Sequence, residues 1–340
     1  MSRGCRGRTS VVPSPMGEDG PMHDDANVFS QQLRSALSAA VRAAADAALP
    51  LVGSGDPDAV DAAAVDALRT ALAAVPAALR VVAGEGEKDG APMLEPGELF
   101  GTGEGPALDL VIDPVDGTRL AAAARPGAMA VLAVAPTGAF LDLGPAYYLD
   151  KLVHAGPDAG LALGAPVAEL LGRLAAARGV GVEELRVAVQ ARPRNARVAA
   201  EVERAGARLH AFEHGDIERV VHAAASAGSL DLLLGIGGAP EGVLEAAIVH
   251  AHGGVMQSRF APQSRREVRR LADAGIDVDR VVGLDALCAA PAFVAMAPVT
   301  PSALGPATTT LVEVVGGPVA QALPSAGSGR RAAAHPLPQR

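Results

Sequence analysis

The sequence predicts an α/β fold in which helices and strands are stacked in layers. Apolar runs of about four to eight residues, the length of a buried strand, recur along the 340-residue chain. Between them lie longer segments whose apolar residues follow the spacing of one helix face. Between residues 185 and 251 the strand and helix patterns alternate, which is typical of sheets covered by helices.

The first half is expected to begin with two helices and to continue as a sheet. Residues 1–26 mix Gly, Pro, Ser and charged residues without periodicity, which predicts a disordered tail. Helices are expected over 28–48 and 59–74, and a short one over 119–125. Glycine and proline dominate 88–106 and predict a loop or flap. Strands are expected over 79–83, 110–112, 128–135, 139–143 and 147–154.

A softer boundary near residues 156–165 suggests two α/β subdomains, 27–155 and 156–315. A metal-binding role for the first and a substrate-binding role for the second are what the family resemblance given below implies. Helices are expected in the second half over 166–178, 194–205, 217–225, 240–251 and 265–274. Strands are expected over 185–190, 208–212, 230–235, 281–284, 292–297 and 309–315. Residues 316–340 are rich in Pro, Ala, Gly and Ser and predict a second disordered tail.

Composition restricts the class of function. The formal net charge of −9 argues against a nucleic-acid surface, which needs a basic face. The sequence has only two cysteines, which fits a reducing compartment. It has neither an apolar run of about 18 residues nor the apolar core of a secretory signal. We therefore expect a soluble, cytoplasmic protein without a membrane or nucleic-acid partner.

The most informative stretch is 108–118, Leu-Asp-Leu-Val-Ile-Asp-Pro-Val-Asp-Gly-Thr. The apolar run predicts a buried strand that ends at Asp113, because Pro114 cannot donate to a ladder. Asp116 and Gly117 would then turn the chain, and Thr118 would begin a helix. Carboxylates suit hard divalent cations, and a helix N-terminus suits a phosphate. A turn of solvated aspartates is the alternative interpretation.

Other acidic residues stand at similar places. Glu85 and Glu87 follow a predicted strand in a Gly-Glu-Gly-Glu run, and Glu241 follows a Gly-rich run at the start of a helix. Strands adjacent in sequence are often adjacent in a sheet, so Glu85 can meet Asp113 and Asp116 in one small volume. Such a cluster would repel itself unless cations filled it. Each run taken alone could be only a structural turn.

These motifs resemble the class II fructose-1,6-bisphosphatases, within the lithium-sensitive, inositol monophosphatase-like phosphatases. The resemblance rests on 113–118, Asp-Pro-Val-Asp-Gly-Thr, on 84–94, on Tyr-Leu-Asp-Lys-Leu at 148–152 and on Gly-Ile-Gly-Gly-Ala-Pro-Glu-Gly-Val at 235–243. It covers about residues 29–315. It implies a five-layer α-β-α-β-α sandwich, Mg²⁺ or Mn²⁺ as cofactor, and a homo-oligomer, dimer or tetramer.

The resemblance also implies roles for residues of this chain. Metal ligands would be Asp61, Glu85, Asp113, Asp116 and Glu241. Catalysis would involve Thr118, which would help activate the attacking water, together with Asp61 and Glu85. The sugar phosphate would contact Asp116, Gly117, Thr118, Tyr148, Arg192, Arg194, His214, Asp216 and Gly238.

The chain departs from the family pattern chiefly on the substrate side. Asp116 stands where these enzymes usually have Glu, Arg192 where they have Lys, and His214 where they have Asp. The leading hypothesis is hydrolysis of the 1-phosphate of fructose 1,6-bisphosphate. The changed positions keep two alternatives open: a phosphatase for a different sugar phosphate in a specialised pathway, and a non-catalytic relative that binds a sugar phosphate.

Overall fold

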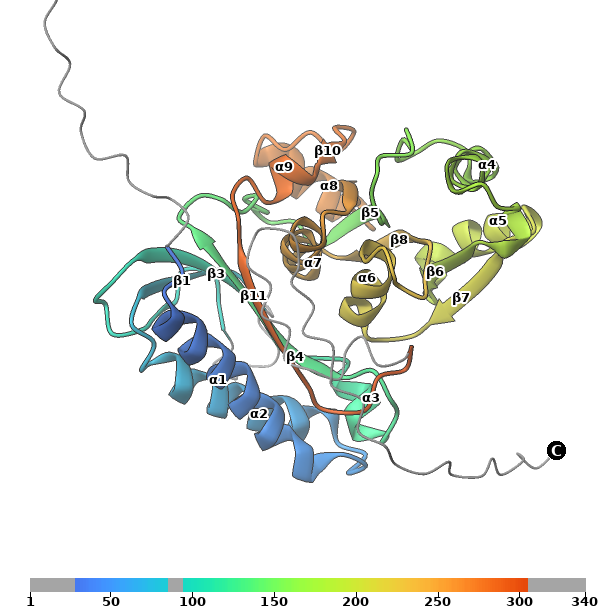
Figure 1. The fold of residues 1–340 in the computed structure, drawn as a ribbon. Helices are drawn as coiled ribbons and strands as arrows, with labels where there is room; N and C mark the ends of the chain where they lie inside the picture. The colour runs from blue at the N-terminus through green and yellow to red at the C-terminus, as the bar shows by residue number, and fades with distance from the viewer. Residues whose placement is uncertain (1–27, 85–93, 305–340) are drawn as a thin grey trace, which may run out of the picture.

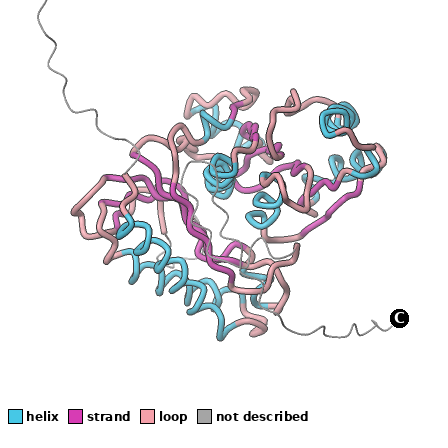
Figure 2. The backbone as a smooth tube through the Cα atoms, viewed as in Figure 1, coloured by secondary structure: helices cyan, strands magenta, loops and turns pink. Residues whose placement is uncertain are grey.

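The computed structural model describes residues 28–84 and 94–304. It contains two mixed β-sheets with helices on both faces of each (Figures 1 and 2). Both predicted tails, the predicted strand at 309–315, the acidic residues Glu85 and Glu87 and part of the predicted flap lie outside the described residues.

The first sheet has the strand order β11-β4-β3-β1-β2, and only β1 and β3 run parallel within it. One face is covered by α1 (Gln31–Ala48) and α2 (Pro57–Leu72). Both helices begin where the sequence supplies a cap: the Ser30 hydroxyl accepts from the Leu33 N–H, and the Asp56 carboxylate accepts from the Ala59 N–H. The strands are β1 (Ala78–Ala83), β2 (Leu99–Phe100), β3 (Ala107–Asp116), β4 (Met129–Pro136) and β11 (Phe293–Pro298).

The second sheet has the order β10-β9-β5-β8-β6-β7. Its strands are β5 (Tyr148–His154), β6 (Arg186–Gln190), β7 (Arg208–Phe212), β8 (Leu232–Gly238), β9 (Val255–Phe260) and β10 (Val282–Gly283). Between the sheets lie α6 (Asp216–Ala224) and α7 (Ala239–His252), and α7 contacts strands of both. The outer face carries α4 (Val167–Arg178) and α5 (Ala196–Arg204) (Figure 1). Shorter or peripheral helices are α3 (Thr118–Ala122), α8 (Arg265–Asp273), α9 (Leu284–Leu287), η2 (Leu49–Leu51), η3 (Val182–Glu184) and η4 (Pro193–Asn195).

The core follows from the two-residue period of the strands. In β3, Leu110 and Ile112 pack with α1 and α2, whereas Val111 packs toward α7. In β6, Ala188 faces the central helices and Val187 faces the outer layer with α4. Each sheet is therefore buried on both faces. The layers run helix, sheet, helix, sheet, helix, which confirms the predicted layered α/β sandwich.

The structure corrects three local predictions. The strand expected to end at Asp113 continues to Asp116, because a register shift opposite β4 accommodates Pro114. The strand expected at 139–143 is only a single bridge between Phe140 and Cys288. Strand β9 was not predicted at all, since its polar residues Gln257 and Arg259 interrupt the apolar signal.

No single position in the sequence separates the strands of the first sheet from those of the second. Strand β5 belongs to the second sheet although it precedes residue 156, and β11 returns to pair with β4 of the first. The division into subdomains at residue 155 stays a prediction.

Candidate functional site

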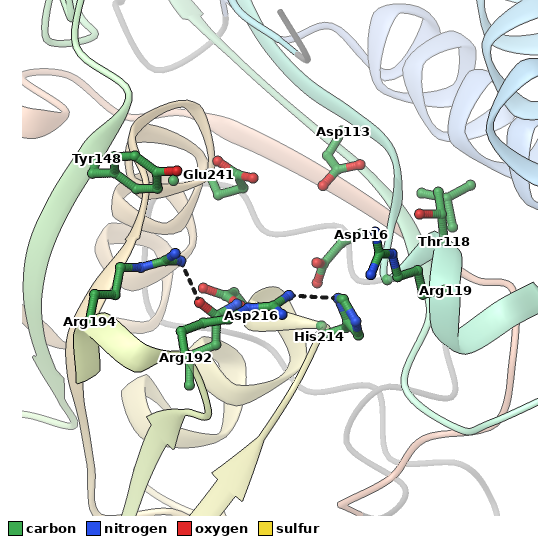
Figure 3. Close-up of a pocket in the computed structure, with 15 residues that line it drawn as sticks. Asp113, Asp116, Thr118, Arg119, Tyr148, Arg192, Arg194, His214, Asp216 and Glu241 are labelled. Carbon is green, nitrogen blue, oxygen red and sulfur yellow. Dashed lines mark hydrogen bonds between the residues drawn. The ribbon is translucent and has the colours of Figure 1, made fainter. Parts of the chain in front are cut away.

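A cavity of about 440 Å³ lies between the end of β3 and the ends of the strands of the second sheet (Figure 3). Its volume is in the range of small-molecule sites. Most of its lining side chains are charged or polar. The lining residues are Asp113, Val115, Asp116, Gly117, Thr118, Arg119, Tyr148, Gln190, Arg192, Arg194, His214, Gly215, Asp216, Gly238 and Glu241.

The acidic wall, defined here as residues 113–118, comes from one continuous segment at the end of β3. Asp113 pairs with Val131 and Asp116 with Met129, so one more residue lies between the two acids on β3 than between their partners. Such a bulge changes the direction of side chains and is common beside active sites. Both carboxyl groups consequently line the cavity, although each residue is only 7% exposed.

Gly117 makes the turn after this bulge possible. Its φ of 86° lies in the left-handed region, and an added Cβ would come within 3.1 Å of Leu120. Helix α3 therefore starts at Thr118, which lines the cavity directly after the two acids.

Asp116 connects β3 of the first sheet to helix α6. Its Oδ2 accepts a hydrogen bond of 2.9 Å from the Ile217 N–H in the first turn of α6. Burial, and then the neighbouring charge of Asp216, raise the pKa of Asp116 to about 8. Without a cation the Asp116 carboxyl group is therefore mostly protonated at pH 7, and a bound cation would favour its charged form.

The opposite side, here called the basic wall, is formed by Tyr148, Arg192, Arg194, His214 and Asp216 (Figure 3). The Arg194 guanidinium lies 4.8 Å from the centre of the Tyr148 ring and donates to the Ile236 carbonyl oxygen at 2.9 Å. It is thus held in place from two sides.

Gln190 links this arginine to an acid. Arg194 donates to the Gln190 side-chain oxygen at 2.8 Å, and the Gln190 amide donates to Asp216 Oδ1 at 2.9 Å. The positions of the guanidinium and the Asp216 carboxylate are therefore coupled through one amide group.

Arg192 and His214 form a second contact in the basic wall. A guanidinium nitrogen of Arg192 lies 3.2 Å from His214 Nδ1. Burial, together with the charges of Arg192 and Arg119, lowers the pKa of His214. The neutral ring can then accept the Arg192 N–H at Nδ1, which leaves other donors of the guanidinium available for a ligand.

Beneath the basic wall lies a buried ion-pair group. The Lys151 ammonium is 2.5 Å from Glu245 Oε1 and 3.4 Å from Asp216 Oδ2, and Glu245 is completely buried. Burial opposes the charge of Lys151, but the carboxylates of Glu245 and Asp216 outweigh it and raise its pKa. Lys151 therefore supplies a fixed positive charge behind Asp216.

Two glycines make room for these groups. A Cβ at Gly237 would lie 2.6 Å from the Lys151 Nζ and 2.9 Å from Asp216 Oδ2. A Cβ at Gly238 would collide with the carboxylate of Glu241. The glycines of β8 thus leave the space that the ends of these charged side chains occupy.

The structure brings most of the predicted site residues together. Every residue predicted to contact the sugar phosphate lines the cavity, as do Asp113 and Glu241 of the predicted metal ligands. Asp61 lies half-buried on α2 and is not among the lining residues. Glu85 lies outside the described residues. Over 28–84 and 94–304, no group of three or more His, Cys, Asp or Glu residues forms a ready metal site. The individual roles stay predictions.

The donor chemistry of the cavity nevertheless fits a hard cation. Carboxylates of Asp113, Asp116 and Glu241 and the hydroxyl of Thr118 are oxygen donors on one cavity. After burial, the charges of Asp216 and Glu241 contribute to the raised pKa of Asp116, so negative charge gathers around this carboxyl group, and a cation would offset it.

Sequence reasoning missed Lys151, Glu245, Gln190 and Arg119. A signal existed for two of them. Lys151 is one of only two lysines in the chain and lies in an otherwise apolar strand segment. Glu245 follows Glu241 by four residues, so both lie on one side of α7. Gln190 and Arg119 carried no such pattern.

Comparisons with known proteins identify the family of the chain. Residues 31–307 match the model of a family described as bacterial fructose-1,6-bisphosphatase, glpX-encoded. The chain is 38% identical over 263 residues to fructose-1,6-bisphosphatase 1 class 2 of Escherichia coli K12, covering 75% of this chain and 78% of that protein. The match to fructose-1,6-bisphosphatase class 2 of Shigella flexneri has the same identity and coverage. These matches confirm the predicted family.

Proposed function

Because the chain belongs to the bacterial glpX-encoded fructose-1,6-bisphosphatase family, we propose that it is a metal-dependent phosphatase that hydrolyses the 1-phosphate of fructose 1,6-bisphosphate. One observation carries the proposal. Carboxylates from β3 and α7 and the guanidinium groups of Arg192 and Arg194, which follow β6, face the same 440 Å³ cavity. The carboxylates suit a cation, and the guanidinium groups suit an anionic substrate.

The acidic wall is assigned to the reacting phosphate. Asp113, Asp116 and Glu241, with Asp61 and Glu85 by resemblance, would hold Mg²⁺ or Mn²⁺. Such an ion lowers the pKa of a bound water and stabilises charge on the leaving oxygen. The Thr118 hydroxyl would orient the attacking water, with Asp61 and Glu85 assisting. The Gly117 backbone would lie against the phosphate.

The basic wall is assigned to the rest of the sugar phosphate. Guanidinium groups bind phosphate oxygens in pairs, so Arg192 and Arg194 would hold the phosphate that is not cleaved. The Asp216 carboxylate, which lies 3.4 Å from the Lys151 ammonium, would accept hydrogen bonds from sugar hydroxyls. Tyr148 and Gly238 would complete the surface around the sugar.

The direct test is phosphate release by the purified full chain, with Mg²⁺ or Mn²⁺, from fructose 1,6-bisphosphate and from a panel of sugar phosphates. Release from the bisphosphate that stops when the metal is chelated is the expected result. Metal-dependent turnover of another ester, with none of the bisphosphate, would reject the default substrate. Binding without any metal-dependent release would point to the non-catalytic alternative.

The Arg192–His214 contact favours the alternative substrate as a second candidate. A histidine at 214 gives the cavity a neutral, bulkier group where the family pattern has a carboxylate, and it uses one donor of Arg192. A His214→Asp variant should then shift the ratio of kcat/KM values toward fructose 1,6-bisphosphate. An unchanged ratio would remove the reason for this candidate.

The remaining assignments also belong to this proposal. We place the family within the inositol monophosphatase-like phosphatases, and we expect a symmetric homo-oligomer that works in the cytoplasm. No described helix has the length and apolar character that crossing a bilayer requires. Sedimentation of the purified chain would test the oligomeric state.

A further inference from the structure

A second cavity, of about 680 Å³, lies on the outer face of the second sheet. Its floor is formed by strands β5, β8 and β9, and its two sides by α4 with the preceding segment and by α5 (β5, β8, α4 and α5 are labelled in Figure 1). It is larger than the cavity assigned to the reaction and within the size range of metabolite sites. Nothing in the proposed phosphatase mechanism uses it.

The charged residues that line this outer cavity form two ion pairs, and one further arginine is not part of a pair among the residues that the structure describes. Arg259 is paired with Asp150 at 2.9 Å, and Arg197 with Glu201 at 2.7 Å. Arg204 also lines the cavity and has no hydrogen bond or ion pair within the described part of the chain. The cavity therefore has one net positive charge, located on α5.

The rest of the lining is largely apolar. Leu163, Pro166 and Val167 form one side, and Val198 of α5 and Leu234 of β8 lie opposite and below. Such a surface favours burial of an apolar or planar group, and the free guanidinium favours an anion. A plain inorganic anion would leave the apolar surface unused.

From this combination we propose that the outer cavity is a second ligand site, which binds an organic anion with one phosphate or carboxylate group and an apolar body. The anionic group pairs with Arg204. The body lies on the apolar lining between α4 and α5.

The test is calorimetric titration of the full chain with phenylphosphonate, which has no ester bond to hydrolyse. An Arg192→Ala/Arg194→Ala variant weakens binding in the first cavity. In that background we expect Arg204→Glu to weaken binding about tenfold or more, the loss typical of one charged contact.

Ala168→Trp, at an exposed lining position of α4, should block the outer cavity without disturbing the core. Arg266→Glu, at an exposed arginine of α8 outside the cavity, is the matched control and should have no effect.

Equal affinities of Arg204→Glu and Arg266→Glu would overturn the proposal, as would binding that disappears in the first-cavity variant. Methylphosphonate, which keeps the anionic group but lacks the ring, should bind several-fold more weakly. Equal binding of the two phosphonates would mean an adventitious ion only, and would also overturn it.

The outer cavity and the first cavity share three segments. Strand β5 supplies Tyr148 to the first cavity and Asp150 to the outer cavity. The segment 192–204 supplies Arg194 to the first cavity and Arg197 to the outer cavity. Strand β8 likewise contributes to both. A ligand that orders these segments in the outer cavity should change the affinity for the phosphatase substrate, which a change in KM would reveal. By reciprocity, the substrate should change the affinity for that ligand by the same factor as the ligand changes the substrate's affinity.

This coupling rests on the proposed function, whereas binding itself does not. In Ala168→Trp only the first cavity remains open, so phenylphosphonate can change the KM there only by competing with the substrate. In the wild-type chain it should change the KM by a different amount, because it also binds in the outer cavity. Identical effects in both proteins would overturn the coupling. A chain with no phosphatase activity would leave the calorimetric result unaffected, so the two failures are distinguishable.

Discussion

The acidic wall and the basic wall face one cavity but are built differently. The acidic wall comes mostly from a single segment, 113–118, in which a bulge and a left-handed glycine aim two carboxylates the same way. The basic wall is assembled from β5, β8, the 190–194 segment and the loop before α6. Its side chains hold one another through Gln190 and Lys151. The positions of the Asp113 and Asp116 carboxylates are therefore set by one short segment, whereas the basic wall depends on long-range packing.

The largest effect should come from the acidic wall. Asp113→Asn removes a charge assigned to cation binding and should lower kcat about 10³-fold or more, since cations supply several kcal/mol of transition-state stabilisation. Steady-state phosphate release measures it. Asp66→Asn, at an exposed position of α2 outside the cavity, is the control. Activity of Asp113→Asn close to that of the control would contradict the assignment of this wall.

The next largest effect concerns the buried ion pair beneath the basic wall and its contribution to the stability of the protein. Lys151→Met leaves Glu245 buried without its cation, and breaking a buried pair typically costs about 3–5 kcal/mol. We expect the urea midpoint to fall accordingly. Lys151→Met/Glu245→Gln, which removes the buried charge as well, should recover part of that loss. If the double variant were the less stable one, the ion pair would not be the reason that Lys151 is buried.

A smaller effect should separate binding from chemistry. Arg194→Ala removes a guanidinium that stacks on Tyr148, and the loss of a charged contact should raise KM about 10- to 100-fold while kcat changes less. Arg266→Ala, at an exposed position of α8, is the control for removing an arginine. If kcat of Arg194→Ala fell as far as that of Asp113→Asn, the basic wall would contribute to the chemical step and not only to substrate binding.

The smallest predicted effect concerns protons. A buried carboxyl group with a pKa of about 8 is neutral below that pH, so cation binding at pH 7 must release the Asp116 proton. The affinity for Mg²⁺ or Mn²⁺ should therefore rise with pH, by up to about tenfold per pH unit, and level off above pH 8. Titrations in buffers of different ionisation enthalpy would count the protons. Asp116→Asn should reduce this slope, and an unchanged slope would assign the released proton to another group.

Most of the fold could be predicted from the sequence because its signals are local. The caps at Ser30 and Asp56, the apolar spacing of α1 and the alternation after residue 185 each depend on neighbours a few residues apart. Strand β9 escaped prediction because Arg259 is paired with Asp150 across the sheet, so a polar residue stands where an apolar one was expected. The continuation of β3 past Pro114 escaped because a bulge depends on the partner strand.

The same division applies to the site. The motif at 113–118 was enough to predict the acidic wall, since its residues adjoin in sequence. The buried Lys151–Glu245 pair could not be predicted, because residues 94 positions apart meet only after α7 packs on β5.

By itself, the sequence determined the element types, the acidic motif and the family, because period, turn chemistry and contiguous motifs are properties of short segments. Only the tertiary structure decided which charges face one another: the Asp116 carboxyl against the Ile217 N–H, the lysine beneath Asp216, and the free guanidinium of Arg204 in the outer cavity. The physical reason is that the electrostatic effect of a side chain depends on distance and burial, and both are set by how the layers pack.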